Sequence, residues 1–308
     1  MTGPGSSLLD RIVSRKRKEI EELQRTGEPS LEGLESPRDF YFHLKNPGGR
    51  LRHGAANANH SAFAGDSDPA SSGTFSDSNP ASASLESDNL AQYLPLKRAI
   101  ISECKKASPS MGLIRPDYDP ARIAETYASL GASCLSVLTD EDFFQGHISH
   151  LAAARTAGIP VLRKDFLIHR LQINQARAAG ADSILLIVRL LSDEDLSDLL
   201  AHARSLNMEP LVEVHCESEL RRACECGARI IGINHRDLDT LEMDLGLSAR
   251  LAPELRKLNP EAVLIAESGI EKGQTLNEMS EFADAFLIGT SLMRSNSIED
   301  GWKTLFGS

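Results

Sequence analysis

The sequence predicts a closed (β/α)8 TIM barrel preceded by a helical extension, and three observations support this prediction. Short apolar runs rich in β-branched residues recur eight times in the last two thirds of the chain. Helical patterns lie between them, and this alternation is typical of a parallel sheet covered by helices. The eight runs occupy about 200 residues, the usual scale of a closed barrel. An open doubly wound sheet has the same alternation, but no G-x-G-x-x-G follows the first run, which makes a dinucleotide-binding sheet the weaker alternative.

The expected strands and several helix ends can be placed individually. The eight runs are residues 98–101, 134–138, 159–162, 184–188, 211–214, 229–233, 262–265 and 285–288. Asp119 is expected to cap a helix that begins at Pro120, because an aspartate accepts from free N–H groups and proline needs no donor at that position. Ser192 and Asp195 form a capping-box pattern at the start of another helix. Glycine ends several helices directly before the next strand, at Gly131, Gly158, Gly180 and Gly227, as expected of αβ loops.

The chain divides into three regions of different composition. Residues 1–45 form the helical extension, in which "RDFYFHL" (38–44) indicates a second short helix. Residues 46–93 are dominated by Ser, Ala, Gly, Asn and Asp. Such a segment buries too little apolar surface to offset the entropy of ordering it, so we expect a disordered insert, with a regulatory role for its serines as the less favoured alternative. Residues 94–308 form the barrel and carry the catalytic function. Within residues 1–45, a first helix is expected from the amphipathic stripe formed by Leu8, Leu9, Ile12, Val13, Ile20 and Leu23.

Charge and hydropathy exclude several classes of partner. The formal net charge is −11 and the pI is about 5.3, which argues against nucleic acid or an anionic membrane as a partner. No segment approaches the ~20 apolar residues of a transmembrane helix. The N-terminus has no apolar signal region, and its acidic residues argue against a transit peptide. We therefore expect a cytoplasmic protein.

The cysteines predict no disulfide framework and no metal centre. Their number is five, and their spacing matches no disulfide-rich scaffold, which favours a reducing compartment. His215, Cys216, Cys224 and Cys226 offer metal-ligand atoms, but the spacing fits no common zinc pattern. No metal centre is therefore expected at these residues.

Charged residues gather where the predicted strands end. Glu103 and Lys105 follow the first strand, two positions apart, so their side chains share one face. Lys164 ends the third strand, Glu213 lies in the fifth and Glu267 ends the seventh. In a barrel, the carboxyl ends of all strands meet at one rim, which is where active sites are built. Opposite charges brought together there shift each other's pKa values, so this set indicates general acid–base chemistry, with a purely structural ion network as the alternative.

The last two predicted strands add a second feature. "ESGI" (267–270) and "IGTSLM" (288–293) each place a glycine where a strand passes into a helix. The loops after strands seven and eight of this fold commonly hold a phosphate group with backbone N–H groups. The two motifs together predict a phosphorylated substrate.

Seven motifs in order along the chain resemble the indole-3-glycerol phosphate synthase family of tryptophan biosynthesis. They are "ECKKASPS", "SVLTDEDFFQG", "VLRKDF", "ARAAGADSILLIV", "GINHRDL", "AESGI" and "FLIGTSLM". The resemblance runs from about residue 97 to 295 and implies a cofactor-free carboxy-lyase. Its substrate would be 1-(2-carboxyphenylamino)-1-deoxyribulose 5-phosphate, which closes to indole-3-glycerol phosphate with loss of carbon dioxide and water. Transient contact with other tryptophan-pathway enzymes would then be expected.

The resemblance also implies roles for the charged residues. Lys164 would be the general acid for ring closure. Lys105 would hold the substrate carboxylate and share acid duty in dehydration, and Glu213 would serve in that dehydration. Glu103 and Asn234 would orient these groups, and Glu267 would support the lysines electrostatically.

The remaining implied contacts concern the phosphate and the aromatic ring. The phosphate would lie against Ser268, Gly269, Gly289 and Thr290, with Arg236 as a charged contact nearby. Ser108 and Pro109 would line a loop over the site. Phe144, Phe166 and Leu185 would enclose the ring, although apolar residues at strand ends also commonly serve only to pack the core.

Two residues depart from the family pattern, and two other functions remain open. Met111 stands where many members have lysine, and Thr290 replaces the more usual serine. One alternative is a sugar-phosphate isomerase or epimerase that uses Cys104 as a base, although Cys104 is expected to face the helices. The other is a non-catalytic scaffold in which the serine-rich insert is the active part.

Overall fold

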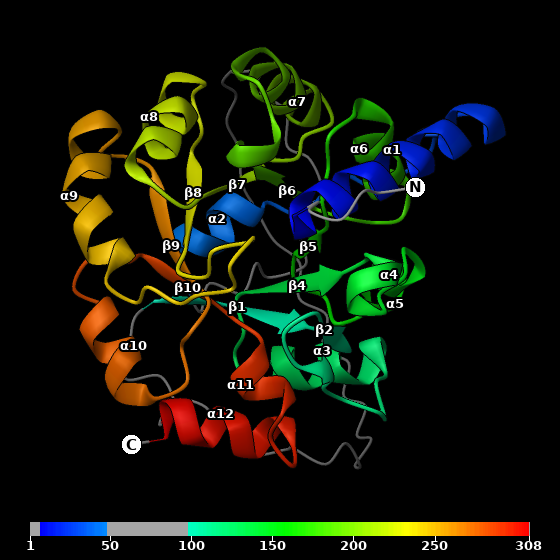
Figure 1. The fold of residues 1–308 in the computed structure, drawn as a ribbon. Coiled ribbons are helices and arrows are strands. Elements are labelled where there is room, and N and C mark those ends of the chain that lie inside the picture. The colour runs from blue at the N-terminus through cyan, green and yellow to red at the C-terminus, as the bar shows by residue number, and fades with distance from the viewer. Residues whose placement is uncertain (1–6, 48–97, 308) are drawn as a thin grey trace, which may run out of the picture.

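The computed structural model describes residues 7–47 and 98–307, and its centre is a closed barrel of eight parallel strands (Figure 1). Neighbouring strands follow the order β1-β10-β9-β8-β7-β6-β5-β4 around the barrel. The strands are β1 (Ala99–Cys104), β4 (Cys134–Leu138), β5 (Val161–Lys164), β6 (Ser183–Ile187), β7 (Leu211–Val214), β8 (Ile230–Asn234), β9 (Val263–Glu267) and β10 (Ala285–Ile288). The predicted (β/α)8 TIM barrel is therefore confirmed, and the open doubly wound sheet is wrong.

Two of the predicted strand positions need correction. The run at 98–101 underestimates β1, which continues to Cys104, so that Glu103 lies within the strand. The run at 159–162 lies two residues too early, because β5 begins at Val161. Pro160 has no N–H for the sheet and precedes the strand, and its carbonyl accepts from Leu135.

Helices surround the barrel, as Figure 1 shows. They are α3 (Pro120–Ser129), α4 (Glu141–Phe144), α5 (Ser149–Arg155), α6 (Arg170–Ala178), η2 (Val188–Leu190), α7 (Asp193–Ser205), α8 (Glu217–Glu225), α9 (Leu247–Leu258), α10 (Gly273–Met279), α11 (Thr290–Met293) and α12 (Ile298–Phe306). A short hairpin, β2 (Ala107–Ser108) and β3 (Gly112–Leu113), follows β1. Asp119 caps α3, with Pro120 as its first residue, and the Ser192 hydroxyl accepts from Asp195 at the start of α7.

The apolar side chains form two layers, one outside the barrel wall and one inside it. The outer layer lies between strands and helices and contains Ile100, Cys104 and Tyr127. The inner layer fills the barrel and contains Ile101, Leu162 and Ile265. Because side chains of a strand alternate between faces, one parity of each strand supplies the inner layer. Cys104 therefore packs against the helices, as its parity predicted.

The helical extension contacts both ends of the barrel. α1 (Leu8–Thr26) lies beside α6, and its Leu9 and Ile12 join the inner layer. α2 (Phe40–Lys45) buries Phe40 and Leu44 against that layer. The Tyr41 hydroxyl donates to the carbonyl of Glu261, just before β9 begins. The extension is therefore packed onto the barrel rather than attached only by the chain.

The predicted insert at 46–93 lies almost wholly outside the described residues. Asn46 and Pro47 follow α2, and the description resumes at residue 98. The boundaries 1–45 and 94–308 therefore remain predictions. Among the helices within 7–47 and 98–307, none has the length and apolar character needed to cross a membrane.

Candidate active site

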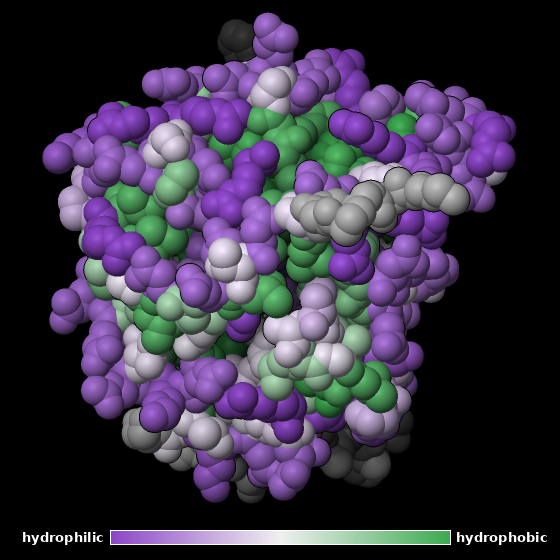
Figure 2. Space-filling view, viewed as in Figure 1, coloured by the Kyte–Doolittle hydropathy of each residue, from purple (hydrophilic) through white to green (hydrophobic). Residues whose placement is uncertain are grey.

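A pocket opens at the C-terminal ends of the barrel strands and contains all of the predicted site residues. Figure 2 shows a hollow on this face, with hydrophobic residues gathered beside it. The predicted residues that line it are Glu103, Lys105, Ser108, Pro109, Phe144, Lys164, Phe166, Leu185, Glu213, Asn234, Arg236, Glu267, Ser268, Gly269, Gly289 and Thr290. They come from sequence positions almost 190 apart, so only barrel closure brings them together.

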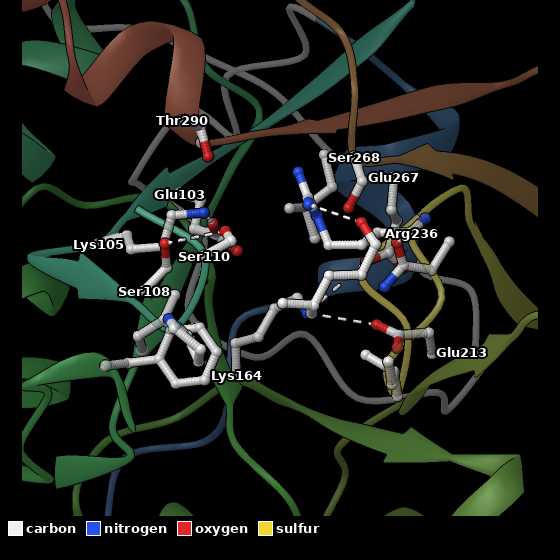
Figure 3. Close-up of a pocket in the computed structure, with 18 of the residues that line it drawn as sticks. Glu103, Lys105, Ser108, Ser110, Lys164, Glu213, Arg236, Glu267, Ser268 and Thr290 are labelled. Atoms are coloured by element: carbon white, nitrogen blue, oxygen red, sulfur yellow. Dashed lines mark hydrogen bonds and ion pairs between the residues drawn. The ribbon is translucent and has the colours of Figure 1, made fainter. Parts of the chain in front are cut away.

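The centre of the pocket is a group of opposite charges. Lys164 Nζ lies 3.3 Å from Glu213 Oε2 and 3.8 Å from Glu267 Oε2. Lys105 Nζ lies 2.6 Å from Glu103 Oε1. Figure 3 shows Lys164 and Glu213 pointing toward one another, with Glu103 and Lys105 on the facing wall. Three carboxylates thus share two ammonium groups, a charge imbalance that favours proton movement.

Two glycines make room for the carboxylates inside the barrel. A Cβ atom at Gly232 on β8 would lie 1.9 Å from Glu267 Oε1. A Cβ atom at Gly289, after β10, would lie 2.3 Å from Glu103 Oε1. Neither glycine has a left-handed backbone, so their role is to leave space rather than to permit a turn. The sequence shows Gly289 as part of a phosphate motif, whereas its contact with Glu103 is visible only in the structure.

Burial and charge set the protonation of this group. Burial acts to lower the pKa of Lys164, but the carboxylates of Glu213, Glu267 and Glu103 outweigh it and raise that pKa. Burial acts to raise the pKa of Glu213, but Lys164 and His215 together outweigh it and hold that pKa well below its usual range. For Glu267, burial and the nearby Glu213 charge raise the pKa to about 8. The site therefore contains an ammonium acid, an ionised carboxylate and a carboxyl that gains a proton near neutral pH.

The loops after β9 and β10 form the glycine-lined end of the pocket. Ser268 and Gly269 have φ angles of 68° and 76°, and the left-handed region is uncommon for a serine. The chain therefore turns sharply here, and backbone N–H groups at such turns commonly hold anions. Thr290 begins α11 on the other side, and Arg236 also lines the pocket.

The opposite wall of the pocket is apolar. The Phe144 and Phe166 rings lie 6.2 Å apart between centroids, and Leu185 is buried beneath the site. Phe166 and Leu185 belong to the inner barrel core and also line the pocket. These two residues therefore both pack the barrel core and line the pocket.

Sequence reasoning missed the contribution of α1 to this wall. Leu8, Leu9 and Ile12 line the pocket next to the barrel residues. Their apolar periodicity was visible in the sequence, but nothing in it showed which surface the helix covers.

The most unexpected residue is Lys16 on α1, which is only 1% exposed. Its Nζ lies 2.8 Å from Asp140 Oδ2 and 2.8 Å from Asp165 Oδ1. Asp140 also accepts from the backbone N–H of Phe143, and so caps α4. Lys16 therefore connects α1 to α4 and to the residue that follows Lys164. A lysine inside an apolar stripe was the available signal.

The residues of the alternative hypotheses lie away from this chemistry. Cys104 is fully buried behind the barrel wall, and burial raises the pKa of its thiol. It does not line the pocket, so the isomerase hypothesis loses its proposed base. His215 faces Glu213 and Glu219 rather than the cysteines. Within the described ranges, no group of His, Cys, Asp and Glu is arranged to hold a metal ion.

Similarity to known proteins decides the family. Residues 72–305 match the family model described as indole-3-glycerol phosphate synthase. The chain belongs to the indole-3-glycerol phosphate synthase family. An indole-3-glycerol phosphate synthase of Leptospira interrogans is 47% identical over 209 residues, which cover 68% of this chain and 82% of that one. A second synthase, from Sulfurimonas denitrificans, is 48% identical over 213 residues, covering 68% and 80%.

Two further matches support more limited conclusions. A "Tryptophan biosynthesis protein TrpCF" of Vibrio parahaemolyticus is 48% identical over 204 residues, which cover 66% of this chain and 42% of that longer one. Among solved structures, a mutant mandelate oxidase with a monooxide FMN adduct matches with a TM-score of 0.51 at 16% identity. It covers 68% of this chain and 70% of that chain. That likeness concerns the fold alone. The family consists of carboxy-lyases of tryptophan biosynthesis, as the sequence motifs predicted.

Proposed function

We propose that this pocket binds 1-(2-carboxyphenylamino)-1-deoxyribulose 5-phosphate and converts it to indole-3-glycerol phosphate. The observation that carries the proposal is the position of Lys164, held by two buried carboxylates between an apolar wall and a glycine-lined end. The aromatic ring would lie on the wall with Phe144 and Phe166, and the phosphate at Ser268, Gly269 and Thr290. The reacting carbons would then lie over the charged centre.

Ring closure requires an acid at the ribulose carbonyl. The ring carbon that bears the carboxylate attacks the carbonyl carbon, and the carbonyl oxygen takes a proton from the Lys164 ammonium. The C–C bond to the carboxylate then breaks, carbon dioxide leaves, and its electron pair restores the aromatic ring. The raised pKa of Lys164 keeps the acid in its protonated form in the free site.

Dehydration requires an acid and a base together. The new hydroxyl leaves as water with a proton from Lys105, and the Glu213 carboxylate accepts a proton from the adjacent ring carbon, whose C–H electron pair forms the C=C bond of the indole. Glu103 lies 2.6 Å from Lys105 and would orient it, as Asn234 would orient the substrate hydroxyls. Glu267, 3.8 Å from Lys164, would support that ammonium group in its ionised form. No metal or cofactor takes part in this scheme.

The decisive test is a fluorescence assay for indole formation from the carboxyphenylamino substrate with purified protein. Turnover that saturates with substrate is expected. Well-folded protein that makes no product would end the proposal, and conversion of a sugar phosphate without indole would favour an isomerase.

We further propose a cytoplasmic enzyme that contacts other enzymes of tryptophan biosynthesis transiently. The longer relative named as a tryptophan biosynthesis protein, of which this chain covers 42%, supports such an association. Faster flux through a mixture with the preceding pathway enzyme than through separated compartments would support it, and equal flux would refute it.

A further inference from the structure

His215 lies directly behind Glu213 and is not part of the pocket lining. Its Nε2 lies 3.3 Å from Glu213 Oε1, on the side of the carboxylate away from Lys164 Nζ, which approaches Oε2. The imidazole side chain is only 2% exposed. Glu213 therefore lies between two nitrogen groups, one that faces the pocket and one that is sealed behind it.

Glu219 on α8 holds this imidazole from its other side. Glu219 Oε2 accepts the backbone N–H of His215 at 2.7 Å and lies 3.2 Å from Nδ1. The ring is thus fixed between two carboxylates, with both nitrogens facing an acceptor. Two carboxylates on either side of the ring favour the imidazolium form, which pairs with Glu213 through Nε2 and with Glu219 through Nδ1.

The chain of alternating charges continues to a second part of the site. Arg189 Nε lies 3.0 Å from Glu219 Oε1, and its Nη1 lies 3.0 Å from Asp237 Oδ2. Asp237 follows Arg236, which lines the pocket. Asp237 Oδ1 also accepts the backbone N–H groups of the loop at Asp239 and Thr240. The network therefore joins Glu213 on β7 to the loop that presents Arg236.

The charges that face these groups are of both signs. Glu213 faces Lys164 on β5, Asn234 on β8, Glu267 on β9 and His215. His215 faces Glu213 and Glu219. Burial acts to lower the pKa of His215, but its interactions with Glu213 and Glu219 outweigh burial and raise that pKa to about 9.

The proposed reaction needs a positive charge next to Glu213 besides that of Lys164. When Lys164 donates its proton, it becomes neutral, and Glu213 loses the charge that keeps it ionised on the pocket side. A cation that does not take part in the reaction is then needed to prevent Glu213 from taking up the proton at the wrong step. His215 is placed to supply that charge, because it is sealed from substrate and anchored by Glu219.

We propose that His215 is a positioning residue for the reaction proposed above, holding the Glu213 carboxylate in place and ionised while Lys164 is neutral. The inference rests on the proposed function, since it assumes that Glu213 acts as the base. It adds the network of His215, Glu219, Arg189 and Asp237 to the residues that support the reaction.

The test is the pH dependence of kcat/KM and kcat for His215→Gln, which keeps a polar side chain but loses the charge. The acidic limb of the profile, which reports Glu213, should move up by about one pH unit or more, the scale expected when a near charge is lost. At neutral pH, kcat should fall by about tenfold while KM changes far less, because the Glu213 carboxylate loses the contact that holds it in place. His202→Gln is the matched control, because His202 bonds to Asn174 away from the pocket and should leave the profile unchanged.

A second variant separates this role from a merely structural one. Glu219→Gln leaves His215 in place but removes its anchor, so the basic limb that reports the imidazolium should move from near pH 9 to lower pH. An unchanged pH profile in both variants, or a change in KM alone, would overturn the proposal. Should His215→Gln fail to fold, Glu219→Gln still carries the prediction.

An NMR titration of the His215 ring tests its contact with Glu213 independently of turnover. In the wild-type protein the ring should stay charged up to about pH 9, and in Glu213→Gln it should lose its proton at clearly lower pH. A ring that titrates alike in both would refute the contact even in an active enzyme. A wild-type protein that makes no indole but shows the expected titration would instead refute the proposed function.

Discussion

Lys16 and Lys164 are both lysines held by carboxylates, but Lys16 is buried and also contacts Glu19, whereas the Lys164 side chain is 16% exposed. Lys16 Nζ lies 2.8 Å from each of its two aspartates, and the site is sealed between α1 and the barrel. Lys164 Nζ lies 3.3 and 3.8 Å from its glutamates, and it faces an open pocket. The same charge pattern thus occurs once as a closed junction and once as a site with room for another molecule.

The carboxylates show the difference most clearly. Asp165 has partners for both oxygens besides Lys16: the Thr139 hydroxyl at 2.5 Å, Arg163 at 3.0 Å and the N–H of Phe166 at 2.8 Å. Neither oxygen of Glu267 has a hydrogen-bond partner among the described residues. Buried polar groups without partners are costly, and they persist where function requires them. Incomplete hydrogen bonding therefore separates Glu267 in the pocket from Asp165 in the junction.

The largest effect is expected for Lys16→Met, on stability. Removing one partner of a buried ion pair leaves the others uncompensated and typically costs about 3–5 kcal/mol. Urea unfolding followed by circular dichroism measures the loss. Lys18→Met, on the exposed face of the same helix, is the control and should change stability by less than about 0.5 kcal/mol. A loss below about 1 kcal/mol for Lys16→Met would mean that the junction is not structural.

For Lys164→Ala we expect the opposite balance, a large effect on turnover and a smaller one on stability. Loss of a general acid lowers the rate by at least ~10²-fold. Glu213 and Glu267 can take up a proton when the ammonium group is removed, which limits the cost to the fold. Steady-state indole formation measures the rate. A wild-type rate in this variant would mean that another residue is the general acid.

Neutralising one carboxylate in each cluster should change stability in opposite directions. Burial acts to raise the pKa of Asp165, but Arg163 and Lys16 outweigh it and lower that pKa below the ordinary 3.8. Its ionised form therefore contributes stability that is present above about pH 4 and lost in acid. Asp165→Asn should be less stable than wild type at pH 7, and the difference should shrink as the pH falls.

Glu267→Gln should instead be more stable than wild type at pH 8. The pKa of Glu267 is about 8 in the fold against an ordinary value of 4.5, so folding binds a proton between these values and stability falls as the pH rises through that window. The gain should vanish below pH 4.5. Denaturation midpoints of the two variants at pH 4, 6 and 8 give the comparison, and shifts of equal sign would contradict it.

The smallest effect is expected for Gly232→Ala. The new methyl group would displace the Glu267 carboxylate, whose Oε1 lies 1.9 Å from the Cβ position. Turnover should fall on the order of tenfold, less than for the loss of Lys164, because the carboxylate is moved rather than removed. Adding Glu267→Asp shortens the side chain and should relieve the overlap, which thermal unfolding of the double variant can show. A single variant with unchanged turnover would mean that the position of Glu267 matters little.

The two clusters also differ in how far the sequence predicted them. Glu103, Lys105, Lys164, Glu213 and Glu267 were predicted to converge, because strand parity and barrel closure place strand ends at one rim. No comparable rule predicts the position of Lys16, because a lysine in an amphipathic helix is normally a solvated residue. Its role depends on where α1 packs, and helix periodicity does not specify the surface that a helix covers.

The same division holds for the molecule as a whole. The sequence by itself determined the (β/α)8 barrel, the family and the barrel residues that converge on the pocket, because these follow from local periodicity and from motifs at strand ends. Only the tertiary structure decided that Gly232 and Gly289 make room for carboxylates, that Lys16 seals α1 to the barrel and that His215 lies behind Glu213. Those contacts join residues far apart in the chain or on faces that local patterns leave open, and their energies depend on burial and distance, which exist only in the folded state.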